Sequence, residues 1–363
     1  MVRRIKLILV FIFFLFTIAM AQNENGNGEQ QEEDIFELKV KEVSFTIIPT
    51  IKLVLPDTSA IIGINQKIGD TNLIAQSEYN YLYSKINYLL QYVVNFYFPL
   101  SFSLYDNVNF EKIYENHKYL QRNKGYGAGL QSPNIFNFLT LKQELKNENY
   151  YFASIEDKLN INQGNILFYN TWIEFLFEQK QKNKTLRDTY LGINFEKAIP
   201  SAFSDYSFLF LNLFFNKIFY YEDKRSLNFY LVYGYLLTGD NLPIWKIYTL
   251  GGYERLMGYP YDEFQGLYKL FGRIKGDSII FDKINWEFLF LKLLNINGFL
   301  VANAGNVGSV YDIQDFTEYK FSVGGGIDLN LLFRNKIKIV LTFTLAQAIN
   351  SGYSPVFYFV YQL

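Results

Sequence analysis

Residues 250–264 of the chain read LGGYERLMGYPYDEF, and this stretch decides how the rest of the sequence is interpreted. It contains the pair Gly251-Gly252, a third glycine, Gly258, followed directly by an aromatic residue, and Pro260. Glycine permits positive φ angles and close approach of the backbone, and proline fixes the exit of the chain. We therefore predict that these residues form a folded loop packed against another part of the protein, and not a flexible tip.

The segments on both sides of this loop alternate between apolar and polar residues, as β-strands do. In residues 319–333 every second residue is apolar, aromatic or glycine, and the residues between are Lys, Ser, Gly, Asp, Asn and Leu. Residues 227–235 and 337–345 repeat the pattern. Each apolar face is about five residues long, the height of a hydrocarbon band crossed by a tilted strand. A soluble sheet would also alternate, but faces this purely apolar opposite small and polar residues favour a membrane β-barrel with a wet lumen.

The fold class that we predict is all-β, a transmembrane antiparallel β-barrel of about 16 strands with an extracellular loop folded inward. An even number of strands places both termini on the periplasmic side. Three long polar segments, residues 110–124, 146–163 and 260–282, are predicted to be loops outside the membrane.

The N-terminus predicts export. Arg3, Arg4 and Lys6 precede an apolar run, and Ala19-Met20-Ala21 supplies small residues at a cleavage site. The alternative is a retained membrane helix, for which the run is short. We predict a signal peptide at residues 1–21, a disordered periplasmic lead-in at residues 22–43, and the barrel at residues 44–363. The lead-in is too short for a folded periplasmic domain.

The composition argues against most site chemistries. The chain has no cysteine and a single histidine, His117, which lies in a polar run that we predict to be a solvated loop. We therefore expect no catalytic residues, no metal site and no cofactor, and we expect that the protein is not an enzyme. Removal of the signal peptide with its basic residues leaves a mildly acidic chain, which argues against a nucleic-acid partner.

Four motifs in the last third of the chain resemble one family. The loop reads Gly-Gly-x-x-x-Leu-x-Gly-Tyr and is followed by KINWEF at residues 283–288, LVANAGNV at 300–307 and SVGGGI at 322–327. Their order and spacing are similar to those of the BamA/TamA outer-membrane barrel superfamily, also called the bacterial surface antigen family. The earlier two thirds match only in pattern. Members of this family normally carry POTRA domains before the barrel, and we expect none here.

The resemblance implies a loop that enters the barrel and touches the lumen wall. The family's loop arginine, which meets an aspartate of the wall, is replaced here by Met257, and Asn303 stands for the aspartate. Replacing both members of a buried ion pair can leave stability unchanged, whereas removing one member leaves a buried charge without a partner. The expectation is therefore a loop held by packing and neutral hydrogen bonds. Arg255 is either a solvated charge or a partner of Glu287. The loop motif comprises Gly251, Gly252, Arg255, Leu256, Met257, Gly258 and Tyr259, and the expected wall contacts are Glu287, Asn303 and Gly305.

The last strand ends in alternating aromatic residues. Phe357, Phe359, Tyr361 and Leu363 share one face, which resembles the signal that presents barrels to the assembly machinery. The usual final residue is Phe or Trp, and here it is Leu363.

Three function classes remain open on the sequence. The first is a BamA/TamA-type barrel of the cell outer membrane that aids insertion or translocation of membrane proteins for a narrow set of partners. The second is a passive solute channel, with Lys320, Asp328 and Lys338 facing the lumen. The third is a surface-exposed interaction protein. The partners implied are outer-membrane lipid and either a separate periplasmic protein or client barrel chains.

Overall fold

The computed structural model describes residues 45–362 except 56–58, 69–70, 81–84, 95–99, 115–116, 155–159, 182–183, 201–203, 222–224, 244–245, 261–262, 285, 289, 310–314 and 334–336. The predicted signal peptide, the lead-in and Leu363 lie outside the described residues. Within them, no helix has the length and apolar character needed to cross a bilayer.

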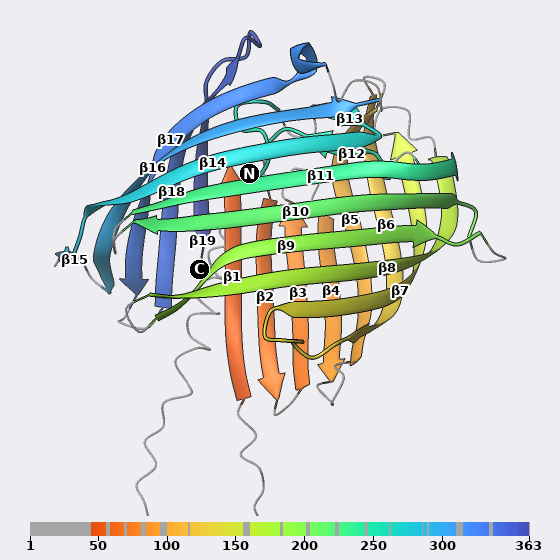
Figure 1. Ribbon diagram of the computed structural model, residues 1–363, viewed down its shortest axis with the longest axis horizontal. Helices are drawn as coiled ribbons and strands as arrows, with labels where there is room; N and C mark the ends of the chain where they lie inside the picture. The colour runs from red at the N-terminus through yellow and green to blue at the C-terminus, as the bar shows by residue number, and fades with distance from the viewer. Residues whose placement is uncertain are drawn as a thin grey trace, which may run out of the picture.

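The described residues form nineteen strands and one 3-10 helix (Figure 1). The strands are β1 (Phe45–Leu55), β2 (Ser59–Ile68), β3 (Thr71–Asn80), β4 (Lys85–Val94), β5 (Leu100–Tyr114), β6 (His117–Gln131), β7 (Leu139–Ser154), β8 (Asn160–Gln181), β9 (Lys184–Ala198), β10 (Ser207–Tyr221), β11 (Arg225–Asn241), β12 (Tyr248–Leu250), β13 (Phe264–Gly266), β14 (Tyr268–Phe281), β15 (Trp286–Phe288), β16 (Leu291–Gly308), β17 (Lys320–Phe333), β18 (Ile337–Ile349) and β19 (Val356–Gln362). The 3-10 helix is η3 (Phe316–Glu318).

Seventeen of these strands form one antiparallel sheet, in which each strand pairs with its neighbours along the chain. One of the seventeen, β15, has only three residues. It pairs with β16 beyond the end of β14, so β14 and β15 together line one side of β16. The other sixteen agree with the number of strands predicted. The last strand, β19, also pairs with β1, so the order of pairing returns to its start and the sheet forms a ring. This is the all-β barrel architecture that the alternation predicted.

The two faces of the sheet differ as the sequence pattern requires. On β19 the side chain of Phe357 is 58% exposed, whereas its neighbour Tyr358 is 1% exposed. On β17 Phe321 and Val323 are exposed on either side of the buried Ser322. The exposed face of these strands is therefore apolar, as lipid contact requires, and the buried face holds polar and small residues.

Three segments predicted to be outer loops are strands for most of their length. Residues 110–124 belong mostly to β5 and β6, so the polar run containing His117 is strand and not loop. Residues 146–163 extend β7 and β8, and residues 260–282 contain all of β14. The prediction was wrong because parts of these strands have no regular apolar face, and a strand of 22 residues such as β8 exceeds the roughly 9–11 residues that cross a bilayer.

The long connection between β11 and β14, residues 242–267, is called the inner loop below. It contains the two-stranded ribbon β12–β13, in which Leu250 pairs with Phe264. Its residues contact both β10 and β19, through Tyr248 to Asn212 and through Gly258 to Tyr358. These two strands are separated along the ring by β11, β14, β16, β17 and β18. A short loop can reach both only by crossing the inside of the ring, so the loop is folded inward as predicted.

Candidate functional site

The turns of the inner loop depend on its glycines. Gly251, Gly252 and Gly258 have φ angles of 125°, 89° and 84°, which other residues rarely adopt. At Gly258 a side chain would also have no room, because an added Cβ would lie 2.6 Å from the backbone nitrogen of Ala348. The apex of the loop, defined as residues 253–259, therefore touches the backbone of β18 directly.

The apex is packed by apolar side chains in two buried clusters. Leu256 and Tyr259 pack with Leu250 and with Phe271 of β14 in one cluster. Met257, which is 4% exposed, packs with Phe299, Val301, Ala346 and Tyr358 in the other. Burial of one such side chain contributes about 2 kcal/mol. Phe299 and Val301 precede Asn303 on the inward face of β16, so Met257 lies along the same wall as Asn303.

Asn303, a predicted wall contact, is hydrogen-bonded to an arginine of the wall. Asn303 is 3% exposed and accepts a hydrogen bond of 2.8 Å from Nε of Arg273, its partner across β14 and β16. Nη2 of Arg273 donates to the main-chain oxygens of Tyr253, at 3.2 Å, and of Arg255, at 2.9 Å. A charged donor therefore joins the apex to the wall, and the expectation of purely neutral contacts was incomplete.

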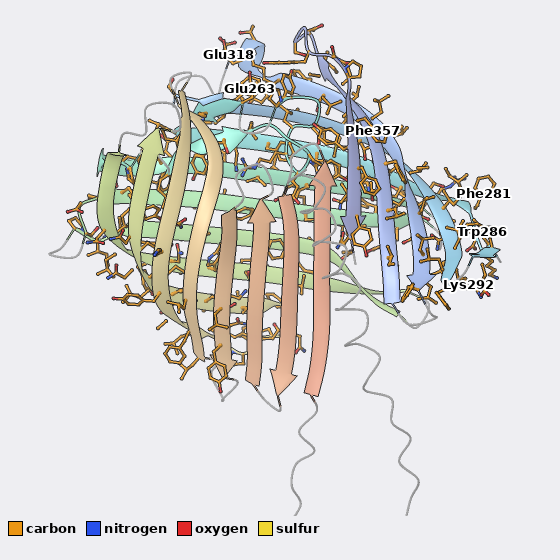
Figure 2. All side chains as sticks on the ribbon, turned by 180° about the vertical axis from the view of Figure 1, so that it is seen from behind. Glu263, Phe281, Trp286, Lys292, Glu318 and Phe357 are labelled. Atoms are coloured by element: carbon orange, nitrogen blue, oxygen red, sulfur yellow. The ribbon has the colours of Figure 1, made fainter. Side chains whose placement is uncertain are left out.

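Arg255 and Glu287 do not meet. Nη1 of Arg255 donates to the main-chain oxygen of Thr249 at 3.2 Å and to its hydroxyl, which ties the apex to β12. Glu287 lies on β15, where it pairs with Lys292 at 3.4 Å and is largely exposed. Figure 2 shows Trp286 and Lys292 at one end of the sheet and Glu263 of the inner loop near the other. The expected contact of Glu287 with the loop is therefore corrected, and Arg255 is half-buried and bonded to Thr249 instead of Glu287.

Gly305 is the third expected wall contact, and it does meet the loop. A Cβ added to Gly305 would lie 2.9 Å from Cδ1 of Leu250. Gly266 and Gly308 approach even more closely, because a Cβ on Gly266 would overlap the backbone of Gly308. The β12–β13 ribbon lies against β16 only because these positions have no side chain.

A second outer connection covers the apex. Residues 350–355 join β18 to β19, and the hydroxyl of Tyr353 donates a hydrogen bond to Glu263 of the inner loop. The Tyr353 ring also meets Tyr259 edge-on, at 5.7 Å between centroids. The hydrogen bond to the Glu263 carboxylate raises the pKa of Tyr353 to about 12. At neutral pH the hydroxyl therefore keeps its proton and the contact.

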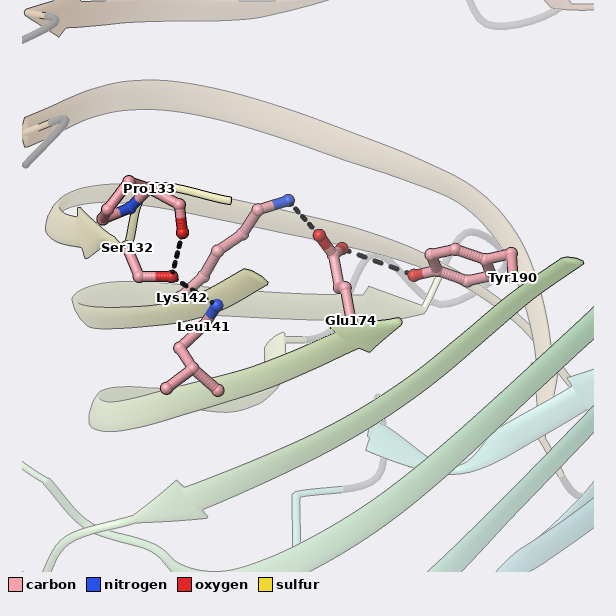
Figure 3. A network of polar contacts seen from close by, with 6 residues as sticks. All are labelled: Ser132, Pro133, Leu141, Lys142, Glu174 and Tyr190. Carbon is pink, nitrogen blue, oxygen red and sulfur yellow. Dashed lines mark hydrogen bonds and ion pairs between the residues drawn. The ribbon is translucent and has the colours of Figure 1, made fainter. Parts of the chain in front are cut away.

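Another part of the inner wall, on β7 to β9, is lined by charges. Lys142 of β7 pairs with Glu174 of β8 at 2.7 Å, and the hydroxyl of Tyr190 on β9 donates to Glu174 at 3.3 Å (Figure 3). Lys146 pairs with Glu144 at 2.8 Å on the same face of β7. Near this network, the amide of Leu141 donates to the hydroxyl of Ser132, which donates to the carbonyl of Pro133 (Figure 3). No group of metal-ligating side chains occurs among the described residues.

The pairing of β1 with β19 is short. It comprises four residue pairs, from Lys52 with Gln362 to Leu55 with Phe359, whereas β1 pairs with β2 over ten. Between β18 and β19 there are seven pairs. We call the β1–β19 pairing the seam. Tyr358 of β19 accepts a 3.0 Å hydrogen bond from the amide of Gly258, so the apex is bonded to a strand of the seam.

The predicted terminal signal lies on β19. Phe357 is exposed, and Phe359 and Tyr361 follow on the same face at every second position. The inward residues between them, Tyr358 and Val360, are buried.

Comparison with known proteins finds structural neighbours of the same architecture. BamA from Haemophilus ducreyi lacking POTRA domains 1-3 is similar with a TM-score of 0.66 and 13% identity, over 88% of this chain and 70% of that one. CdiB from Acinetobacter baumannii (TM-score 0.55, 12% identity) and CdiB from Escherichia coli (0.57, 10%) match over 88% and 87% of this chain. The chain spans 59% and 62% of those two CdiB chains. At these identities the likeness concerns the fold, which is that of an outer-membrane β-barrel.

Sequence comparison adds nothing to this. No protein-family model matches the chain. No curated protein matches it either.

Proposed function

We propose that this protein is an outer-membrane β-barrel of the BamA/TamA type, which aids insertion or translocation of other membrane proteins for a narrow set of partners. The observation that supports this best is the contact between the inner loop and the seam. The apex donates to Tyr358 on β19, and β19 is held to β1 by only four residue pairs. A loop bonded to a short junction of the barrel is placed to influence whether that junction opens.

The physical argument concerns relative strength. Each inter-strand hydrogen bond contributes about 1 kcal/mol. A junction of four residue pairs therefore separates at a much lower cost than one of ten or more, such as β1 with β2. Separation would expose the edges of β1 and β19, and an exposed strand edge pairs readily with another strand. A client strand is one such partner.

The first experiment asks which proteins depend on this one. After its depletion, quantitative mass spectrometry of the outer membrane should show a small group of barrels reduced and the bulk unchanged. Loss of most barrels together would contradict the narrow set of partners, and loss of none would contradict the insertion function.

The second experiment tests the seam. Leu53 and Tyr361 are register partners across it, so Leu53→Cys with Tyr361→Cys should lock it by a disulfide. The control keeps Tyr361→Cys and combines it with Leu341→Cys, its partner on β18. Each double variant is then expressed in the depleted cells. We expect the protein locked at the seam, and not the control, to fail to restore the abundance of the affected barrels until a reductant breaks the disulfide. Equal restoration by both would contradict a role for the seam.

A passive solute channel is the second candidate, favoured by the charged wall of β7 to β9. Paired charges such as Lys142 with Glu174 line a hydrated passage without a large net field. Conductance of the purified protein in a planar bilayer, with and without residues 251–264, distinguishes the two. A channel plugged by the loop should conduct steadily once the loop is removed, while depletion should leave the other barrels unchanged.

A further inference from the structure

The inner loop has a second attachment, far along the ring from its apex. The first leg of the loop, defined as residues 242–250, packs on β8 to β11. Leu242 and Tyr248 lie against a buried cluster that includes Phe168 and Ala198. The Tyr248 ring fits there because Gly234 of β11 has no side chain, and a Cβ at Gly234 would lie 2.5 Å from that ring.

Lys246 is the charged residue of this first leg, and its ammonium group is surrounded on several sides. Its Nζ lies 2.5 Å from Oε1 of Glu196 on β9. It also lies 4.6 Å from the ring centre of Phe168 on β8 and 5.8 Å from that of Phe208 on β10. The side chains of Lys246 and Glu196 are only 19% and 17% exposed.

Burial alone would lower the pKa of Lys246. The carboxylates of Glu196 and Glu148 outweigh this effect and raise the pKa above its ordinary value. The group is therefore charged at any physiological pH. Glu148 lies on β7 and is 5% exposed, so a second, buried carboxylate acts on the cation besides Glu196 and the two aromatic faces.

Aromatic faces together with carboxylates are the chemistry by which proteins recognise ammonium groups. We infer that Phe168, Phe208, Glu196 and Glu148 form an ammonium-binding cage in the barrel wall, which Lys246 of the same chain occupies. The cage anchors the first leg independently of the apex. When the Lys246 side chain is removed, the cage accepts a free primary alkylammonium ion in its place. This inference does not depend on what the barrel inserts or transports.

The cage differs in kind from the attachment of the apex. The apex contacts the wall through apolar side chains, glycines and the bonds of Arg273 to main-chain oxygens. The first leg is held by an ion pair inside an aromatic enclosure. One attachment can therefore be released by competing cations while the other is retained.

The test uses chemical rescue with two reporter cysteines, because the chain has no cysteine of its own. Ala198→Cys reports on the first leg, since Ala198 is 1% exposed and is the register partner of Phe168. Ala346→Cys reports on the apex, since Ala346 is 1% exposed in the cluster of Met257. Reaction of each cysteine with a water-soluble thiol reagent is timed in the folded, purified protein, whose folding is checked by its resistance to heat and detergent.

Lys246→Ala should accelerate labelling of Ala198→Cys roughly tenfold or more, as loss of a partly desolvated ion pair implies, and leave Ala346→Cys unchanged. n-Butylamine should restore protection at Ala198→Cys, and n-butanol at the same concentration should not. Adding Glu196→Gln should abolish the rescue. Lys269→Ala, which removes a lysine over the Tyr248 ring, is the control and should show no rescue by the amine.

Three results would overturn the inference. Unchanged labelling in Lys246→Ala would mean that the lysine does not anchor the first leg. Faster labelling without rescue, or equal rescue by butanol, would mean that the cage does not recognise an ammonium group. Where Lys246→Ala fails to fold, Glu196→Gln alone provides the same test of anchoring, because it keeps the shape of the carboxylate and removes its charge.

Discussion

The inner surface of this barrel has two contrasting walls. The wall of β14 to β19 is made for contact, because residues such as Gly305 and Ala346 leave room for the inner loop. The wall of β7 to β9 holds charges that pair with one another, as Lys142 does with Glu174. Small residues permit backbone approach, whereas hydrated charges oppose it. The place where the apex docks is therefore determined by the absence of side chains as much as by attraction.

The contact wall also carries charges, such as the pair Lys275 with Asp277, and one of its charged residues, Arg273, bonds the apex. It donates to two main-chain oxygens of the apex and to Asn303. The expectation placed Met257 of the loop against Asn303 of the wall with no charge in the contact. Here the wall supplies an arginine, and the main chain of the loop accepts its hydrogen bonds.

The largest effect is expected from Gly258→Ala. The added Cβ would meet the backbone of Ala348, and the φ of 84° would be strained, so the apex should leave the wall. The combined cost should exceed about 3 kcal/mol, which corresponds to a roughly hundredfold faster labelling of Ala346→Cys. Gly276→Ala on β14 is the control, because the nearest side chain would be 3.8 Å away. Equal protection in both variants would show that the apex does not touch β18.

Arg273→Met should have the next largest effect. It removes the charged donor to the apex and should weaken docking by about 2 kcal/mol, seen as faster labelling of Ala346→Cys. Labelling of Ala198→Cys, under the first leg, should stay the same. Lys338→Met, at an exposed site on β18, is the control. An Arg273→Met protein with full protection would mean that packing alone holds the apex.

Tyr358→Phe should have a moderate effect. The variant keeps the aromatic ring that packs on Tyr253 at 5.2 Å but removes the hydroxyl that accepts from Gly258. One neutral hydrogen bond contributes about 1 kcal/mol, so labelling of Ala346→Cys should rise about fivefold. Tyr361→Phe, on the outward face of the same strand, should leave protection unchanged. A fivefold rise in the control as well would point to a general loosening of β19.

The contact of Tyr353 with Glu263 should give a small, pH-dependent effect. The pKa of this tyrosine rises from 10.0 to about 12 in the folded protein, because its protonated hydroxyl bonds the carboxylate. Its stabilisation is therefore complete below pH 10 and is lost as the pH rises through about 12. At every pH below 10 the thermal midpoint of the wild type should be slightly higher than that of Tyr353→Phe. The difference should shrink as the pH rises through about 12. A difference that grows with pH would contradict this assignment.

Substitutions in the charged wall of β7 to β9 should change ion conduction and leave the docking of the apex unchanged. Lys142 is 38% exposed, so its pair with Glu174 contributes less than about 1 kcal/mol to stability. Lys142→Met should leave labelling of Ala346→Cys unchanged. In a conducting form it should raise the selectivity for cations, measured as a shift of the reversal potential. Glu174→Gln should shift it towards anions. The same shift in both variants would mean that these charges do not line the conducting path.

The sequence predicted the class of the fold because lipid imposes alternation on every strand that it touches. The faces of Phe357 and Phe321 could be assigned in this way, whereas the inward folding of the loop was expected from its three glycines and from the resemblance of its motif to that of a family. The error at β14 has a physical origin. Its outward face contains Leu270, Ile274 and Ile280, but Gly272, Gly276 and Ser278 lie between them and hide the period.

The error at β14 also hid Arg273. Of its neighbours at every second position, Lys269, Lys275 and Asp277 are polar and Phe271 is apolar, and this mostly polar face is the signal by which a lumen-facing strand could have been found. The cage around Lys246 could not be predicted at all. It brings together single residues from β7, β8, β9 and β10 with one from the inner loop, and no local pattern connects them.

The central claim is that the apex lies on the wall of β14 to β19 inside the barrel. The direct test is a cross-link from Met257→Cys with a short bifunctional thiol reagent. Paired with Ala346→Cys, a member of the same buried cluster, it should give a rapid cross-link in the folded protein. Paired with Ala198→Cys on β9, in a different cluster, it should give none. The reverse result, or no cross-link to either position, would contradict the account.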